Sequence, residues 1–144
     1  MKAYESSARI NASPERVWSV LSDGDRWASW ESGVTRVEGR IAESAKLKIF
    51  SEVSPGRAFP LKVVGYEPSR GMTFAGGMPL GLFRGVRRYT LRPVSGEVTE
   101  FTMREEYSGP LLPLIWRSMP DLQPSFDKFA AGLKQQVESA VAHP

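Results

Sequence analysis

Two residues of opposite charge, Arg87 and Glu105, stand in strand-like segments whose alternate positions are mostly apolar. The two segments flank residues 95–97, Ser-Gly-Glu, which are typical of a hairpin turn. If the hairpin closes with Val94 opposite Val98, Arg87 faces Glu105 across it. A charged pair on an apolar sheet face either only neutralises itself or forms the polar anchor of a ligand pocket, and both interpretations stay open.

Glu105 and Tyr107 are the candidate groups for proton transfer, because both fall on the same face of the second segment. The chain has a single histidine, His143, one residue from its end, and no cysteine. Histidine acid–base chemistry, thiol nucleophiles and Cys/His zinc sites are therefore all but excluded. We expect no metal and no cofactor.

The composition predicts one globular domain spanning residues 1–144. The chain carries 19 Lys and Arg against 16 Asp and Glu, a net charge of +3, and the two signs are interspersed. A nucleic-acid partner is therefore not expected. Residues 1–5 lack the apolar run of a signal peptide, no stable membrane insertion is expected, and a chain without cysteine suits the cytoplasm. The oligomeric state stays open.

Alternating polarity predicts strands over most of the first two thirds of the chain. Residues 13–23 interrupt that pattern as a short helix. Ser13 is a good N-cap, Pro14 suits the first helical position, and Asp23 with Gly24 predicts the stop. A second short helical segment carrying Trp27 follows. Such short helices need a larger element to pack against.

The last third of the chain changes to a helical period. Its apolar residues form one stripe at Phe126, Phe129, Ala130, Leu133, Val137 and Ala140. Prolines at 113, 120 and 124 predict a broken approach to this long helix.

These elements predict an α+β fold in which a curved antiparallel sheet wraps around the C-terminal helix. About six or seven strands at ~4.8 Å spacing make a sheet on the order of 30 Å wide, whereas a helix is only ~10–12 Å across. The sheet must therefore curl around the helix, and the two short helices after the first strand close one end. An incompletely filled sheet of this kind predicts an internal apolar cavity.

Several motifs carry a resemblance to a known superfamily. The run Ser13-Pro14-Glu15-x-Val17-Trp18-x-Val20-Leu21-x-Asp23, followed by Trp27-x-x-Trp30, resembles the start of the START/Bet v 1-like (SRPBCC) superfamily, which has a helix-grip fold. The later runs Gly81-Leu82-Phe83-x-Gly85-Val86-x-Arg88-Tyr89 and Glu105-Glu106-Tyr107-Ser108-Gly109 resemble its bacterial polyketide cyclase/dehydrase-like members. The superfamily includes lipid carriers, aromatic cyclases and Hsp90-activator relatives, so the resemblance specifies a fold more than a function. Arg87 stands where related bacterial sequences often have a histidine, which argues against histidine-based cyclase chemistry.

Within that fold, strand parity and the helical stripe select the residues that face the cavity. The expected ligand-binding residues are Trp27, Leu47, Ile49, Leu61, Val63, Phe74, Phe83, Arg87, Tyr89, Phe101, Met103, Glu105, Phe129 and Leu133.

Two apolar segments outside the strands are expected near the cavity. The glycine-rich segment 76–81 is expected to be a flexible hairpin that gates the cavity. Residues 111–116 are expected to pack against the sheet rim rather than to form a lid that touches a membrane.

The favoured function is the binding or carriage of an apolar small molecule or lipid in the cavity, without covalent chemistry. The first alternative is a metal-free cyclase/dehydratase-like enzyme that orients a polyketide-like chain and uses Glu105 or Tyr107 for proton transfer. The second alternative is a protein-interaction module that uses the outer face of the sheet and needs no cavity.

Overall fold

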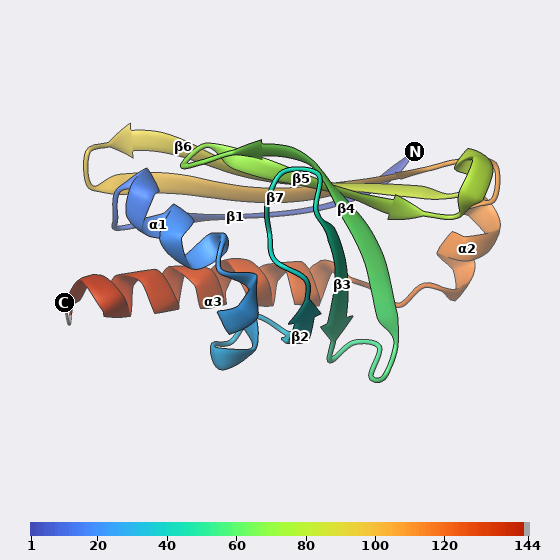
Figure 1. Ribbon diagram of the computed structural model, residues 1–144, viewed down its shortest axis with the longest axis horizontal. Coiled ribbons are helices and arrows are strands. Elements are labelled where there is room, and N and C mark those ends of the chain that lie inside the picture. Colours follow the sequence, from blue (N-terminus) through green and yellow to red (C-terminus); the bar gives the residue numbers. More distant parts are fainter. Residues whose placement is uncertain (143–144) are drawn as a thin grey trace.

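A computed structural model describes residues 1–142 (Figure 1). The strands are β1 (Lys2–Ile10), β2 (Val34–Glu38), β3 (Lys46–Ser51), β4 (Ala58–Glu67), β5 (Gly71–Gly77), β6 (Arg84–Ser95) and β7 (Val98–Ser108). The helices are α1 (Pro14–Leu21), α2 (Leu112–Ser118) and α3 (Gln123–Ala142), with short 3₁₀ helices η1 (Gly24–Ser29) and η2 (Pro79–Gly81). The single histidine of the chain, His143, lies outside the described residues.

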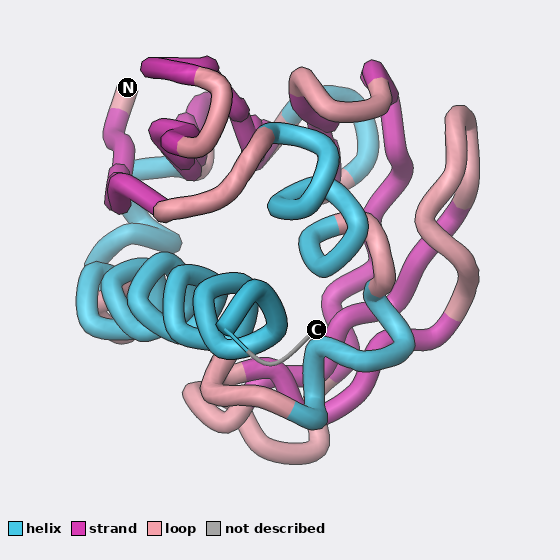
Figure 2. Tube along the Cα trace, turned by 90° about the vertical axis from the view of Figure 1, so that its left-hand side faces the viewer, coloured by secondary structure: helices cyan, strands magenta, loops and turns pink. Residues whose placement is uncertain are grey.

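The strands form one antiparallel sheet in the order β1-β7-β6-β5-β4-β3-β2. Register shifts between Val63 and Gly65 and between Val34 and Arg36 mark irregularities that bend the β2–β4 side. Figure 2 shows the sheet curving around α3, so that the helix lies inside the arc. The predicted helix-grip fold is confirmed.

The first helix begins where the sequence indicates. The Ser13 hydroxyl accepts a hydrogen bond from the backbone N–H of Arg16 at 3.4 Å, and Pro14 occupies the first helical position. The helix ends at Leu21, before the expected stop at Asp23 and Gly24. Gly24 instead begins η1, where an added Cβ would lie 2.9 Å from the Ile41 side chain, so its small size serves packing.

The hairpin of β6 and β7 has the register expected for its inner face. Leu91 pairs with Phe101, Tyr89 with Met103, and Arg87 with Glu105. The expected pairing of Val94 with Val98 is wrong, because the register shifts after Pro93 and Ser95 takes the place opposite Val98. The irregularity lies in the turn and leaves the pairs further along the strands unchanged.

The hydrophobic core fills the end of the arc covered by α1 and η1. Trp27 lies at its centre, with its indole N–H donating to the carbonyl oxygen of Leu21 at 3.0 Å. The rings of Phe74, Tyr89 and Phe129 pack around it at centroid distances of 6.4, 6.0 and 5.0 Å. The two short helices therefore close this end of the sheet, as the sequence predicts.

The approach to α3 is broken, as the prolines indicate. The short helix α2 ends at Ser118, and α3 begins only at Gln123. Trp116 of α2 stacks on Tyr4 at 5.3 Å and approaches Tyr107 at 5.8 Å, so this segment packs on the ends of β1 and β7. It lies at the end of the sheet opposite α1 (Figure 1).

Candidate functional site

A cavity of about 580 Å³ lies between the inner face of the sheet, α2 and the start of α3. Its walls are largely apolar, with Ile49 and Leu61 from the curled strands, Met103 from β7, and Phe126 and Phe129 from α3. The cavity occupies the end of the arc that the aromatic core leaves unfilled.

The residues expected to bind a ligand divide into two groups. Those that line the cavity are Ile49, Leu61, Phe83, Arg87, Met103, Glu105 and Phe129, together with the proton-transfer candidate Tyr107. Those that do not line it are Trp27, Leu47, Val63, Phe74, Tyr89, Phe101 and Leu133, which are buried in the core. Strand parity selected the inward face correctly, but the cavity extends along only part of that face.

One ion pair lies in the inner wall, and the exposed Arg57 of the β3–β4 connection is a further charged lining residue. The Arg87 Nε donates to Glu105 Oε1 at 2.8 Å, and Arg87 Nη1 donates to the Tyr89 hydroxyl at 3.4 Å. The guanidinium also lies 4.8 Å from the centre of the Phe126 ring. The side chains are 22% and 13% exposed, so water reaches the pair only in part.

The surroundings keep Arg87 charged. Burial is the largest single effect and favours the neutral guanidine, but the Glu105 carboxylate, Tyr89 and Tyr107 together outweigh it, so that the pKa of Arg87 is raised. The pair therefore brings a positive and a negative charge into the cavity wall that together sum to zero.

The Tyr107 hydroxyl is the most unusual polar group in the site. It is buried and, by distance and angle, makes no hydrogen bond among the described residues, although the Glu105 carboxylate lies close enough to act on it. Burial raises its pKa, and the negative charge of Glu105 raises it further, so the phenol stays protonated at neutral pH. A buried hydroxyl without a partner costs free energy unless something else bonds to it.

Gly85 leaves space in front of these polar groups. It lines the cavity on β6, opposite Tyr107 in the register. A Cβ added here would lie 3.4 Å from Glu105 Oε2 and 3.5 Å from the Tyr107 ring, in ordinary contact. A larger side chain at position 85 would therefore fill the space beside Oε2.

Other lining residues were not selected from the sequence. They include Gly76 and Gly77 at the end of β5, Met78 of the β5–β6 connection, and Ile115, Met119 and Leu122 in and after α2. The glycine-rich segment thus borders the cavity, as its expected gating role requires, although the gating itself stays a prediction. Of these last three, only Ile115 lies in the apolar segment 111–116 that the sequence indicates, whereas Met119 and Leu122 lie between α2 and α3, where no period indicates a direction.

A second hollow of about 440 Å³ lies beside η1 and the β2–β3 connection. Asp23, Asp25 and Arg40 contribute to its lining, and no predicted site residue does. The apolar cavity is therefore the better candidate for the site.

Residues 1–138 match the family described as polyketide cyclase/dehydrase and lipid transport. No curated protein matches the chain. Solved structures with the same fold include the aromatase/cyclase Zhui from Streptomyces sp. R1128, 14% identical over 97% of this chain and 95% of that one, with a TM-score of 0.75. Norcoclaurine synthase from Thalictrum flavum is 14% identical over 97% and 96% of the two chains, with a TM-score of 0.73.

The di-domain aromatase/cyclase BexL of the BE-7585A biosynthetic pathway is 16% identical, with a TM-score of 0.72. The match covers 100% of this chain and 48% of BexL, so the chain spans about half the length of that protein. At these identities the neighbours show the fold alone, while the family match extends over most of the sequence. The chain belongs to the polyketide cyclase/dehydrase and lipid transport family.

Proposed function

We propose that the cavity binds a hydrophobic small molecule that carries an uncharged polar group. One observation carries the proposal: an apolar cavity of about 580 Å³ has the Arg87–Glu105 pair and an unpartnered Tyr107 hydroxyl in its wall. Ligand pockets usually measure about 300–1,000 Å³ and combine apolar walls with a few polar groups. The size and the lining both match this description.

The polar groups beside Gly85 favour a hydroxyl or carbonyl over an ionised group. Arg87 and Glu105 neutralise each other, so a carboxylate would gain from one partner and be repelled by the other. Glu105 Oε1 is engaged by Arg87, while Oε2 lies beside the space at Gly85. A ligand hydroxyl there could donate to Oε2 and accept from the protonated Tyr107.

A cyclase or dehydratase activity is the second candidate. Glu105 and Tyr107 line the same cavity, and the neighbours Zhui and BexL are described as aromatase/cyclases. Because the pKa of Tyr107 is raised, Glu105 is the better proton acceptor and Tyr107 the better hydrogen-bond donor. Conversion of a bound β-polyketone analogue by the parent, abolished in Glu105→Gln with binding retained, would establish this activity; binding without turnover would favour carriage.

The interaction-module alternative has less support. On the outer face of the sheet, Arg88 pairs with Glu106 and Arg104 pairs with Glu5, at 3.3 and 2.8 Å. Such self-paired charges are typical of a solvated surface. Binding of an apolar ligand inside the sheet is therefore the function that the geometry supports best.

Titration with an apolar fluorescent dye tests the proposal. Gly85→Leu should fill the space beside Glu105 and Tyr107 and weaken dye binding at least about tenfold, from a roughly micromolar Kd in the parent. Gly96→Leu is the matched control, because a Cβ at Gly96 meets nothing within 4 Å. Thermal melting shows whether both variants fold. A parent that binds no dye, or a folded Gly85→Leu that binds as well as the parent, would overturn the proposal.

A further inference from the structure

Exposed apolar side chains gather at the end of the sheet where the cavity lies. Three of them, Met78, Leu80 and Leu82, belong to the β5–β6 connection, and Leu114 belongs to α2. The two segments are joined by a hydrogen bond from the Leu111 N–H to the Leu82 carbonyl oxygen at 2.9 Å. Figure 1 shows η2 and α2 at this same end. We call Met78, Leu80, Leu82 and Leu114 the apolar tip.

Two leucines of the apolar tip make little contact with the rest of the folded chain. The side chain of Leu80 is 96% exposed and that of Leu114 is 67% exposed. Leu80 also has a φ of 61°, in the left-handed region that glycine and asparagine adopt at lower cost. The Leu80 side chain buries almost no surface within the described chain. A contact with another molecule would explain why an apolar side chain stands at this position.

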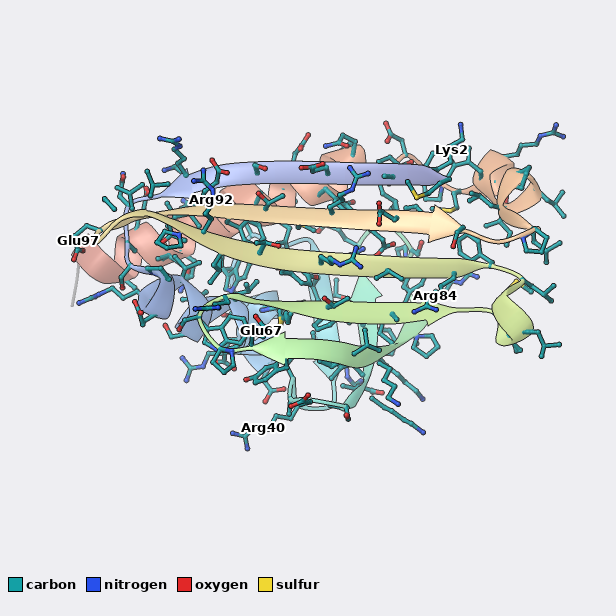
Figure 3. All side chains as sticks on the ribbon, turned by 90° about the horizontal axis from the view of Figure 1, so that it is seen from above. Lys2, Arg40, Glu67, Arg84, Arg92 and Glu97 are labelled. Atoms are coloured by element: carbon teal, nitrogen blue, oxygen red, sulfur yellow. The ribbon has the colours of Figure 1, made fainter. Side chains whose placement is uncertain are left out.

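Basic residues lie on or beside the segments of the apolar tip. Lys2, Arg84 and Arg117 are exposed, and within residues 1–142 no carboxylate lies within 4.0 Å of their charged nitrogens. Neither 68–96 nor 107–120 contains an Asp or Glu. Figure 3 shows Lys2 and Arg84 near this end, with Glu67 and Glu97 toward the other.

We propose that the apolar tip and its basic rim dock the protein on the surface of an anionic lipid bilayer. Protruding leucines on two neighbouring segments can enter the boundary between headgroups and acyl chains, while the surrounding cations meet lipid phosphates. The charge complementarity selects a bilayer that contains anionic lipid. Among residues 1–142 no helix is long and apolar enough to cross a membrane, so the contact is one of surface docking.

Docking in this orientation would bring the cavity to the lipid surface. Met78 belongs both to the apolar tip and to the cavity lining, and Ile115, next to Leu114 in α2, also lines the cavity. An apolar ligand dissolved in the bilayer would then have a short path to the cavity. The docking itself does not depend on what the cavity binds.

Vesicle sedimentation tests the proposal. We expect the full chain to bind vesicles of phosphatidylcholine mixed with phosphatidylglycerol, and to bind pure phosphatidylcholine far more weakly. The double variant Leu80→Asn/Leu114→Gln should bind at least about tenfold more weakly, because both leucines lose their apolar burial. Arg84→Ser and Arg117→Ser should each reduce binding about fivefold, and added salt should reduce it further.

Matched controls lie elsewhere on the surface. Val64→Ser removes an apolar side chain that is 52% exposed on β4, and Arg40→Ser removes an exposed charge from the β2–β3 connection; both should bind vesicles like the parent. Asn suits the left-handed backbone at position 80, and thermal melting confirms that the variants fold. Gly85→Leu, which fills the cavity, should also keep its vesicle binding.

Three results would each overturn the proposal. The parent could fail to sediment with anionic vesicles, or the control variants could lose as much binding as the leucine variants. Analytical ultracentrifugation could instead reveal a dimer that Leu80→Asn/Leu114→Gln dissociates, in which case a second copy covers the apolar tip.

Discussion

Arg87 and Glu105 meet across β6 and β7, with the guanidinium Nε donating to the carboxylate Oε1 at 2.8 Å. The pair lies in the wall of an apolar cavity, between the unfilled space at Gly85 and the packed ring of Tyr89. The pair links two strands of the sheet and also lines the candidate site. Its effect on stability and its effect on ligand binding can be measured separately.

Removal of either partner should destabilise the fold. Arg87→Met or Glu105→Met leaves a poorly solvated charge, and we expect each to cost up to about 3 kcal/mol in the free energy of unfolding, because the pair is largely but not fully buried. The double replacement should recover much of that loss. Urea unfolding of the parent, both single variants and the double variant measures the coupling. Single variants as stable as the parent would contradict a buried pair.

The same double variant distinguishes a ligand-anchoring role of the Arg87–Glu105 pair from a purely structural one. If the pair anchors a ligand, Arg87→Met/Glu105→Met should lose affinity for a long-chain alcohol and keep its affinity for a wholly apolar dye. Unchanged affinity for both probes would show that the pair only stabilises the sheet.

Tyr107→Phe should leave stability within about 0.5 kcal/mol of the parent, because the lost hydroxyl makes no hydrogen bond within the described chain. Its affinity for the alcohol should fall severalfold, while the dye binds as before. Tyr89→Phe is the matched control: it removes a hydroxyl that accepts from Arg87 Nη1, so it should lose about 0.5–1 kcal/mol of stability. A Tyr107→Phe variant that binds the alcohol as well as the parent would remove Tyr107 from the site.

Stability should decline above about pH 10. Burial raises the pKa of Tyr107 and of Tyr89 above their ordinary value of 10.0. Below that value both tyrosines are protonated in the folded and unfolded chain, so they add no pH dependence. Above it the unfolded chain releases protons that the folded chain retains, and each tyrosine lowers the free energy of unfolding by about 1.4 kcal/mol per pH unit. Urea unfolding from pH 8 to 11 should show a shallower decline for Tyr107→Phe; equal slopes would indicate that this hydroxyl ionises normally.

The glycine-rich segment 76–81 should exchange its amide hydrogens more slowly when the cavity is filled. Gly76 and Gly77 line the cavity, and Met78 follows them, so a bound ligand would restrain the segment. Hydrogen exchange measured with and without the alcohol tests this, with the β6–β7 turn at 95–97 as an internal reference that should not change. Equal exchange of the segment in both states would remove the gating role.

The fold was predictable because its signals are local. The Ser13 cap, the alternation of β6 and β7, and the stripe of α3 each depend on residues close in sequence, and their periods specify which face is buried. The inner-face register survived the irregularity at the turn, since the shift falls after Pro93 and not before it.

The extent of the cavity was not predictable in the same way. Parity shows that Tyr89 and Phe101 face inward, but it does not show how far along the strands Trp27 and Phe129 fill the arc. Lining residues such as Met119 and Leu122 lie in the irregular approach to α3, where no period indicates a direction.

Methyl NMR during a titration with an apolar ligand tests the central claim most directly. The account predicts that the methyl groups of Ile49, Leu61, Met103 and Ile115, which line the cavity, shift on binding, whereas those of the exposed Val64 and Val94 do not. Shifts confined to Val64, Val94 and other outward positions, or no shifts at all, would contradict a ligand site inside the sheet.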